Sequence, residues 1–276
     1  MKLLNFGCGH TFHQDWINID LVSTSPEVRG YDIRKNFPYP NDYFDACYSS
    51  HVIEHMNRHE CVSVISECYR ILKPQGIVRV VVPDLESIAR AYLCALERVT
   101  SGVTTAESDY NWMTIELIDQ LVRSTKGGEM GKYLSSQNTS DASKKFISSR
   151  IGIEAEGYWK PEPIPKSLID RIKSKNLSWF LKSLQNLTIQ LLLYTIGGNQ
   201  AQRVFKEGLF RNSGEVHRWM YDRYSMQRLL EQAGFANVRI CQAEESRISD
   251  FNKYELDTFK GSIRKPDSLF IEAVKP

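Results

Sequence analysis

Residues 44–84 contain the pattern that most restricts the fold of this chain. Residues 44–48 and 77–82 are apolar runs of strand length. Between them apolar residues recur at helical spacing, and the tetrapeptide KPQG at residues 73–76 has the cation, proline and glycine typical of a helix end. The run IVRVVV is typical of a central parallel strand that is covered on both faces. The segment therefore predicts a strand-helix-strand unit of an α/β protein, joined by a right-handed crossover.

The rest of the chain divides by its pattern. The sequence YSMQRLLEQAGF predicts an amphipathic helix that ends at Gly234, and strands are expected in ANVRICQA and SLFIEAV after it. Residues 100–215 lack this alternation and contain the proline cluster KPEPIPKS. We therefore expect an α/β core that carries an insertion.

Length, charge and cysteine spacing limit the class of protein. A chain of 276 residues, 42% hydrophobic, is long enough for one large domain with an insertion. The net charge of +2 argues against a protein that coats nucleic acid, so we expect no nucleic-acid partner. The six cysteines have no CxxC spacing, which favours reduced thiols. No secretory signal is recognisable, and a cytoplasmic protein is expected.

Two glycines and an acid lie close together near the start of the chain. Gly7 and Gly9 follow an apolar strand, and Asp20 ends the next one. Glycines at this position let a ligand approach the backbone, and the acid can accept hydrogen bonds from ribose hydroxyls. Gly9 and Asp20 are only 11 residues apart, whereas dinucleotide-binding folds need about 20, and the third glycine is missing. A nucleoside ligand without a pyrophosphate is favoured over NAD.

Five segments together resemble a known family: LNFGCG, INID, YDI, FPYPNDYFDACYSSHVIEH and RILKPQGIVRVVVPD. They are similar to class I S-adenosylmethionine-dependent methyltransferases of the subgroup found in sugar, polysaccharide and secondary-metabolite pathways. The resemblance implies a Rossmann-like, mostly parallel seven-stranded sheet with a reversed last strand and shortened N-terminal connections. It implies a cofactor-binding core in residues 1–99 and 211–276. Residues 100–210 would be a largely helical insertion that forms a substrate lid or an oligomer interface.

The resemblance also implies roles for individual residues. Gly7, Cys8 and Gly9 would pass beneath the methionine part of S-adenosylmethionine, and Asp20 would take the ribose hydroxyls. The adenine would contact Asp32 and Ile33, and the methyl-bearing side would be lined by Ser49, Ser50 and His51. The helix that often closes this pocket from the N-terminal side is absent, which suggests that the insertion supplies the lid.

Methyl transfer to a hydroxyl needs alignment and a base, and a histidine suits the second role at neutral pH. His51 follows a central strand, and His217 lies where the insertion rejoins the core. Either could be the catalytic base, and each could instead cap a helix or orient the chain. Asp84, at another strand end, could orient the acceptor or cap the next helix.

Two further groups of residues have alternative explanations. Arg218, Trp219 and Tyr221 could hold a sugar by stacking and hydrogen bonds, or could belong to a helix start and the core. The histidines at 51, 55 and 59 could share one helix face as metal ligands, with Glu54 nearby. The HExxH order is absent, however, and the resembled subgroup is usually metal-independent, so no metal is expected.

Residues 177–198 predict an amphipathic helix, too short in its apolar run to cross a bilayer. Packing against the core or in a homodimer is favoured over peripheral attachment to an anionic membrane, which would suit a lipid-linked glycan. The sequence therefore predicts an S-adenosylmethionine-dependent methyltransferase acting on oxygen of a sugar or other hydroxylated metabolite, with a small-molecule or glycan acceptor. An N-methyltransferase, an NAD-linked oxidoreductase and a non-catalytic cofactor-binding subunit are the alternatives.

Overall fold

The structure is a computed structural model that describes residues 1–136, 139–159 and 177–276. Its centre is a seven-stranded sheet of order β3-β2-β1-β4-β5-β9-β6. The strands are β1 (Leu3–Phe6), β2 (Ile17–Asp20), β3 (Val28–Gly30), β4 (Phe44–Ser50), β5 (Leu72–Pro83), β6 (Ala236–Cys241) and β9 (Ser268–Val274). Strand β9 runs antiparallel to both β5 and β6, while the pairs from β3 to β5 are parallel. The predicted seven-stranded sheet with a reversed last strand is confirmed.

The strand-helix-strand unit has the predicted form. Helix α1 (Arg58–Ile71) begins after a capping box in which Asn57 and Glu60 satisfy each other's backbone groups, and it ends directly before β5. The KPQG segment belongs to β5, where Gln75 has a positive φ of 65° and donates its N–H to the Lys275 carbonyl. Strand β5 is buried from residue 78 to residue 83, as a central strand requires.

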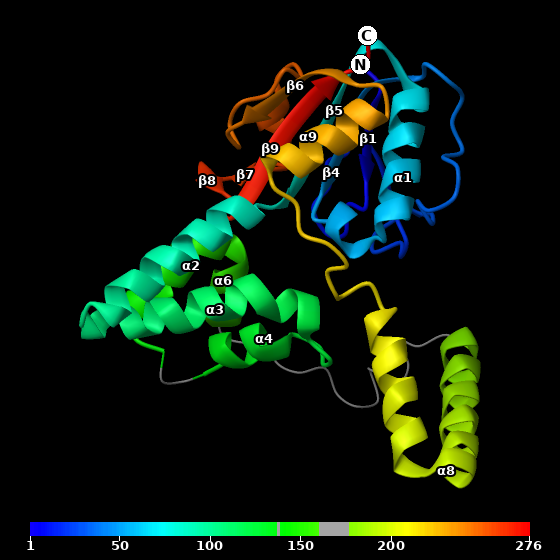
Figure 1. Cartoon of the computed structure of the whole chain (residues 1–276). Helices are drawn as coiled ribbons and strands as arrows, with labels where there is room; N and C mark the ends of the chain where they lie inside the picture. The colour runs from blue at the N-terminus through cyan, green and yellow to red at the C-terminus, as the bar shows by residue number, and fades with distance from the viewer. Residues whose placement is uncertain (137–138, 160–176) are drawn as a thin grey trace.

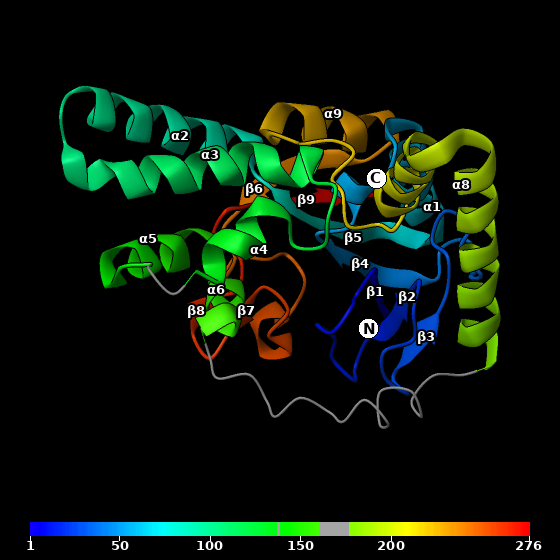
Figure 2. The same cartoon turned by 90° about the horizontal axis from the view of Figure 1, so that it is seen from below.

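The two faces of the sheet are covered differently (Figures 1 and 2). Helices α1 and α9 (Arg223–Gln232) pack together on one face, over a core that includes Ile65 and Met226. The core of the other face joins Tyr48 and Phe270 to residues 241–256, which contain the short 3-10 helix η3 (Phe251–Tyr254). The connections 7–16 and 21–27 contain no helix, so this irregular C-terminal segment covers the face that crossover helices would otherwise cover.

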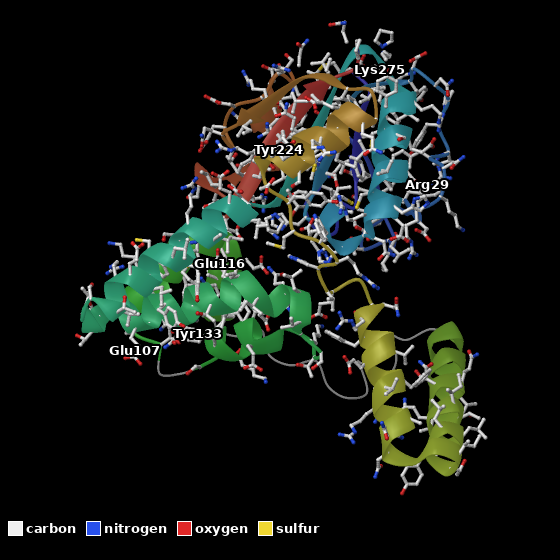
Figure 3. All side chains as sticks on the ribbon, viewed as in Figure 1. Arg29, Glu107, Glu116, Tyr133, Tyr224 and Lys275 are labelled. Atoms are coloured by element: carbon white, nitrogen blue, oxygen red, sulfur yellow. The ribbon has the colours of Figure 1, made fainter. Side chains whose placement is uncertain are left out.

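A helical layer extends from one end of the sheet (Figure 1). It contains α2 (Leu85–Thr100), η2 (Thr104–Ala106), α3 (Glu107–Val122), α4 (Gly128–Leu134), α5 (Asp141–Ile151) and α6 (Ile153–Trp159). It has its own hydrophobic core around Trp112 and Ile147. Within it Glu116 is buried, accepting a hydrogen bond from the Trp112 indole at 2.7 Å and pairing with Arg150 (Figure 3).

Helix α8 (Leu177–Arg211) stands apart from the other elements in Figure 1. It bends back on itself at Gly198, where φ is 63° and ψ is −160°, so its two arms run side by side. Several large apolar side chains on it are exposed, including Leu187, Leu191 and Ile196. No helix among the described residues is long and apolar enough to span a membrane.

A buried arginine joins the sheet to the C-terminal segment. Arg79 on β5 is 0% exposed and lies 2.7 Å from Asp257 and 2.8 Å from Glu272 on β9. Its guanidinium also donates to the backbone carbonyls of residues 242, 243 and 245. The Tyr48 hydroxyl donates to Asp257 at 2.5 Å. The charge is therefore desolvated but fully hydrogen-bonded, and it fixes residues 242–257 to the centre of the sheet.

We expect Arg79→Ala to lower the free energy of unfolding by about 3–5 kcal/mol, because two buried carboxylates would lose their counter-ion. Urea denaturation measures this change. The matched control is Arg239→Ala on β6, where the side chain is exposed and the loss should stay below about 0.5 kcal/mol. Equal losses in the two variants would contradict the role assigned to Arg79.

Candidate functional site

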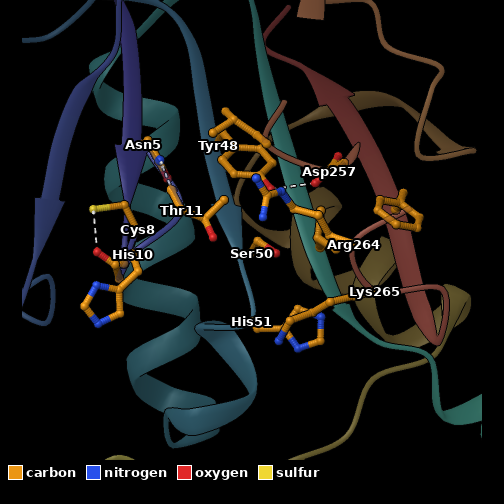
Figure 4. Close-up of a pocket in the computed structure, with 15 residues that line it drawn as sticks. Asn5, Cys8, His10, Thr11, Tyr48, Ser50, His51, Asp257, Arg264 and Lys265 are labelled. Atoms are coloured by element: carbon orange, nitrogen blue, oxygen red, sulfur yellow. Dashed lines mark hydrogen bonds between the residues drawn. The ribbon is translucent and has the colours of Figure 1, made fainter. Parts of the chain in front are cut away.

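A cavity of about 250 Å³ opens at the carboxyl ends of β1 and β4. The strand order reverses at this point, since β1 lies between β2 and β4, and open α/β sheets bind ligands at such a position. Figure 4 shows Cys8 and His10 on one side of the cavity, Asp257 and Arg264 on the other, and Ser50 between them. The cavity is therefore built jointly by the N-terminal loop and the C-terminal segment.

Gly7 and Gly9 have different structural roles in the loop after β1. Gly7 has a φ of 66° and donates its N–H to the Ile19 carbonyl, and a Cβ atom there would lie 2.3 Å from Val52. Gly9 has a φ of 53°, and a Cβ atom would meet nothing within 4 Å. Gly7 is required for packing, whereas Gly9 leaves open space beside the cavity that it lines.

Asp20 holds this loop from the end of β2. Its carboxylate accepts the N–H of Gly9 at 2.9 Å and that of Val22 at 3.1 Å. Burial, followed by the charge of Asp20, raises the pKa of Cys8 to about 12, so this residue is a protonated thiol at neutral pH. The predicted glycine loop and its acid are thus in direct contact.

The two residues expected at the adenine end lie outside this cavity. The Asp32 carboxylate accepts two hydrogen bonds of 2.8 Å from the Arg34 guanidinium, and that pair lowers the pKa of Asp32. Ile33 is buried in the core that includes Phe6 and Phe37. Both follow β3, which β2 and β1 separate from β4 in the sheet.

His51 takes a strained backbone conformation at the end of β4. Its φ is 55°, a left-handed value that is uncommon outside glycine, and its N–H is held by the Val81 carbonyl at 2.9 Å. The Nε2 atom lies 2.8 Å from the Ser268 hydroxyl, and Nδ1 lies 3.3 Å from Oε1 of Glu54. Burial lowers the pKa of His51, which keeps the ring neutral.

A second, larger cavity of about 730 Å³ lies between the sheet and the helical layer. His51 and Lys265 line both cavities. The remaining lining carries both signs of charge, and it includes Arg123, Lys132, Glu154, Glu215 and the aromatic Tyr158. His51 therefore stands where the two cavities meet.

His217 reaches the second cavity from the segment that leaves α8. Its N–H bonds to the Gln120 carbonyl at 2.9 Å, and its ring packs edge-on against His55 with the centroids 4.7 Å apart. It is 4% exposed, and burial lowers its pKa to about 3. The structure thus brings His51 and His217, the two histidines selected from the sequence, to one cavity.

The residues expected to hold the acceptor lie elsewhere. The Arg218 side chain bonds to the Arg211 carbonyl and to Asn212. Trp219 and Tyr221 line a separate cavity of about 170 Å³. None of the three is among the residues lining the two larger cavities.

Asp84 and Ser49 are also outside both cavities. The Asp84 carboxylate accepts the Glu86 N–H at 3.1 Å, so it caps α2, and burial raises its pKa. Ser49 is 1% exposed, and its hydroxyl has no hydrogen-bond partner within the described parts of the chain. Ser50, in contrast, lines the first cavity.

Residues 256–267 also contribute to both cavities, although the sequence did not mark them as candidates. Asp257, Arg264 and Lys265 line the first cavity, and Lys265 and Asp267 line the second. These residues lie in an irregular stretch around the hairpin of β7 (Thr258–Phe259) and β8 (Ser262–Ile263). No motif or periodicity marks such a stretch, so no sequence signal was available to find them.

Asp267 is a buried acid with a strongly raised pKa. Burial raises its pKa from 3.8 to about 7, the negative charges of Glu116 and Glu154 add to the rise, and Lys265 and Arg150 oppose it. The unfolded chain releases this proton near pH 3.8 while the folded protein keeps it up to about pH 7. The stability that the protonated acid contributes is therefore complete below pH 3.8. It falls as the pH rises from there and is fully lost once the pH has passed 7.

We expect the Asp267→Asn variant not to lose this stability as the pH rises, because the amide does not ionise. The unfolding free energy of the variant minus that of the wild type should rise between pH 4 and 7, by up to about 1.4 kcal/mol per pH unit, and then level off. Urea denaturation at a series of pH values measures the difference. A difference that stays constant across this range would show that Asp267 ionises normally.

Comparisons with known proteins give a family match over part of the chain. Residues 17–80, from β2 into β5, match the family model described as "Methyltransferase domain". That match begins after the glycine loop and ends before the helical layer. No curated protein matches the chain.

Among solved structures, the chain is similar to an S-adenosylmethionine-dependent methyltransferase from Archaeoglobus fulgidus, with 11% identity and a TM-score of 0.39 over 99% of this chain and 86% of that one. It is also similar to one from Mesorhizobium loti, with 12% identity and a TM-score of 0.38 over 99% and 90% of the two chains.

The glycine loop fits the cofactor of such enzymes, because Gly9 leaves open space and an acid stands at the end of β2. Residues 17–80 thus match a methyltransferase domain, and the sheet with its reversed β9 is the fold that the resemblance to class I S-adenosylmethionine-dependent methyltransferases implied.

Proposed function

We propose that this enzyme transfers a methyl group to a hydroxyl oxygen of a sugar or similar hydroxylated metabolite. The observation that carries the proposal is the position of His51, which lines both cavities. When bound, S-adenosylmethionine supplies an electrophilic methyl group on a sulfonium. A donor in the first cavity and an acceptor in the second would meet beside this histidine, which is the alignment that methyl transfer requires.

The N-terminal loop would hold the donor. Gly7, Cys8 and Gly9 present backbone to the first cavity, and Asp20 has its carboxylate beside the loop for the ribose hydroxyls. We assign the adenine end to the chain after β3, at Asp32 and Ile33. The Asp32 carboxylate would then accept hydrogen bonds from both the adenine and the Arg34 guanidinium.

The second cavity supports a polyhydroxylated acceptor. Its charged side chains of both signs offer donors and acceptors for hydroxyl groups, and Tyr158, 44% exposed, offers an aromatic face. Part of the lining comes from α3, α4 and α6, within the insertion of residues 100–210. We therefore propose that this insertion forms the acceptor side of the site.

His51 is the proposed general base. Glu54 beside Nδ1 favours the tautomer with its proton on that nitrogen, so Nε2 is the acceptor, bonded to the Ser268 hydroxyl until a substrate replaces it. At the acceptor an O–H bond breaks and an O–C bond forms. The proton passes to Nε2, and the electron pair of the broken C–S bond stays on sulfur. The products are a methyl ether and S-adenosylhomocysteine.

We expect Gly9→Ala to weaken S-adenosylmethionine binding at least about tenfold, because the new methyl group would occupy the open space beside the cavity. Calorimetric titration of the purified protein measures this. The matched control is Gly261→Ala, which also has a positive φ of 78° and open space but lies outside both cavities. Binding of NAD, with no binding of S-adenosylmethionine by the wild type, would overturn the assignment of the first cavity.

We expect His51→Asn to lower kcat about 10²–10⁴-fold, the usual contribution of a general base, with affinity for S-adenosylmethionine changed only a few fold. Transfer of labelled methyl to monosaccharides, nucleoside-diphosphate sugars and oligosaccharides measures kcat, and mass spectrometry of the product identifies the methylated atom. The control is His59→Asn, because His59 is exposed on α1 away from both cavities. Methylation of nitrogen, or equal kcat values in the two variants, would contradict the proposal.

A further inference from the structure

Glu54 is a buried carboxylate beside His51. It is 0% exposed, and neither of its oxygens has a hydrogen-bond partner in the described ranges of the chain, although His51 lies 3.3 Å from one of them. The Nδ1 atoms of His55 and His217 are also buried without partners there. Native proteins rarely leave several buried polar groups of one cluster unsatisfied, because each loses its hydration without compensation.

The fold holds these three residues together through backbone contacts. The 3-10 helix η1 (Ile53–His55) places Glu54 and His55 side by side after β4. The Glu54 carbonyl accepts the N–H groups of Arg218 at 2.7 Å and Trp219 at 3.2 Å, which fixes the segment that carries His217. Residues far apart in the sequence are thus positioned before any ligand arrives.

The side chains lie at a separation that one ion can bridge. One potential ligand atom from each of Glu54, His55 and His217 lies within 4.8 Å of the others. Metal–ligand bonds of about 2.0–2.2 Å place tetrahedral ligand atoms roughly 3.3–3.5 Å apart, so a small inward movement of the side chains closes the site.

We propose that Glu54, His55 and His217 bind a divalent transition-metal ion, with Zn²⁺ the best match. Two imidazoles and one carboxylate are a donor set of catalytic zinc sites, which keep a further position for substrate. This set differs from the helical series suggested by the sequence, because η1 ends at His55 and His59 is exposed on α1.

Arg123, which lines the same cavity as His55 and His217, does not take the place of the ion. Its guanidinium is paired with Asp119 at 2.7 Å and lies 3.8 Å from Glu215. Both carboxylates therefore offset the repulsion between Arg123 and a cation.

The open position of the ion would face the acceptor. His55 and His217 line the second cavity, and His51 stands beside Glu54 where the two cavities meet. An acceptor hydroxyl oxygen is a suitable further ligand, and binding to the ion would lower the pKa of that hydroxyl before His51 takes its proton. This role rests on the proposed function, whereas binding of the ion itself does not.

Metal binding is tested on chelator-treated protein with Co²⁺ as a spectroscopic probe and Zn²⁺ as competitor. We expect one ion per chain, a visible absorption of low-symmetry Co²⁺ that Zn²⁺ abolishes, and a rise in Tm with added Zn²⁺. His217→Gln and His55→Gln should each weaken binding at least about 100-fold, and His59→Gln should leave it unchanged. Absence of binding by the wild type, or equal binding by His217→Gln and His59→Gln, would overturn the proposal.

Glu54→Gln distinguishes a lost ligand from a damaged fold. Without metal its Tm should equal or exceed that of metal-free wild type, because an unpaired buried charge is removed, and added Zn²⁺ should no longer raise it. A Zn²⁺-dependent rise equal to that of wild type would exclude Glu54 as a ligand. S-adenosylmethionine titrated into the same metal-free protein gives a separate result, so failure of the metal site and failure of the proposed function remain distinguishable.

Discussion

The site depends on the ion-pair network of Arg79. A guanidinium with 0% exposure is tolerated in the centre of a sheet because two carboxylates and three backbone carbonyls surround it. Those partners belong to β9 and to the segment between β6 and β9. By holding that segment on the helix-free face, the network places Asp257 in the first cavity and lets the following residues reach the second. One desolvated charge thus couples sheet stability to cavity shape.

The junction of the two cavities shows how local strain and tertiary contacts combine. His51 takes a left-handed φ that β4 alone would not favour, and the carbonyl of Val81 on β5 holds it there. Its ring lies between Ser268 on β9 and Glu54 just before α1. Three elements therefore fix the position of the His51 side chain. A histidine at the tip of a mobile loop would not be held in one position in this way.

Sequence patterns predicted those parts of the fold in which local order repeats. The sequence allowed β5, α1, the glycine loop and the carboxylate of Asp20 to be found. Each of them depends on residues that are close together in the sequence. His217 could be selected as a residue, but its contact with His55 follows from tertiary packing, which no periodicity records. The positions of Trp219 and Tyr221 in a separate cavity, and of Asp267 in the second, follow from tertiary packing alone.

The placement of β9 has a consequence for the order of assembly. Among the described strands, β6 pairs only with β9, and β9 is synthesised after β6 and inserts between it and β5. During translation β6 therefore stays unpaired until β9 leaves the ribosome. Until then Arg79 also lacks its ion-pair partner Glu272. Such non-local closure is slow, and it exposes strand edges in the meantime. Ligand sites that need both halves of the chain can form only after this last step.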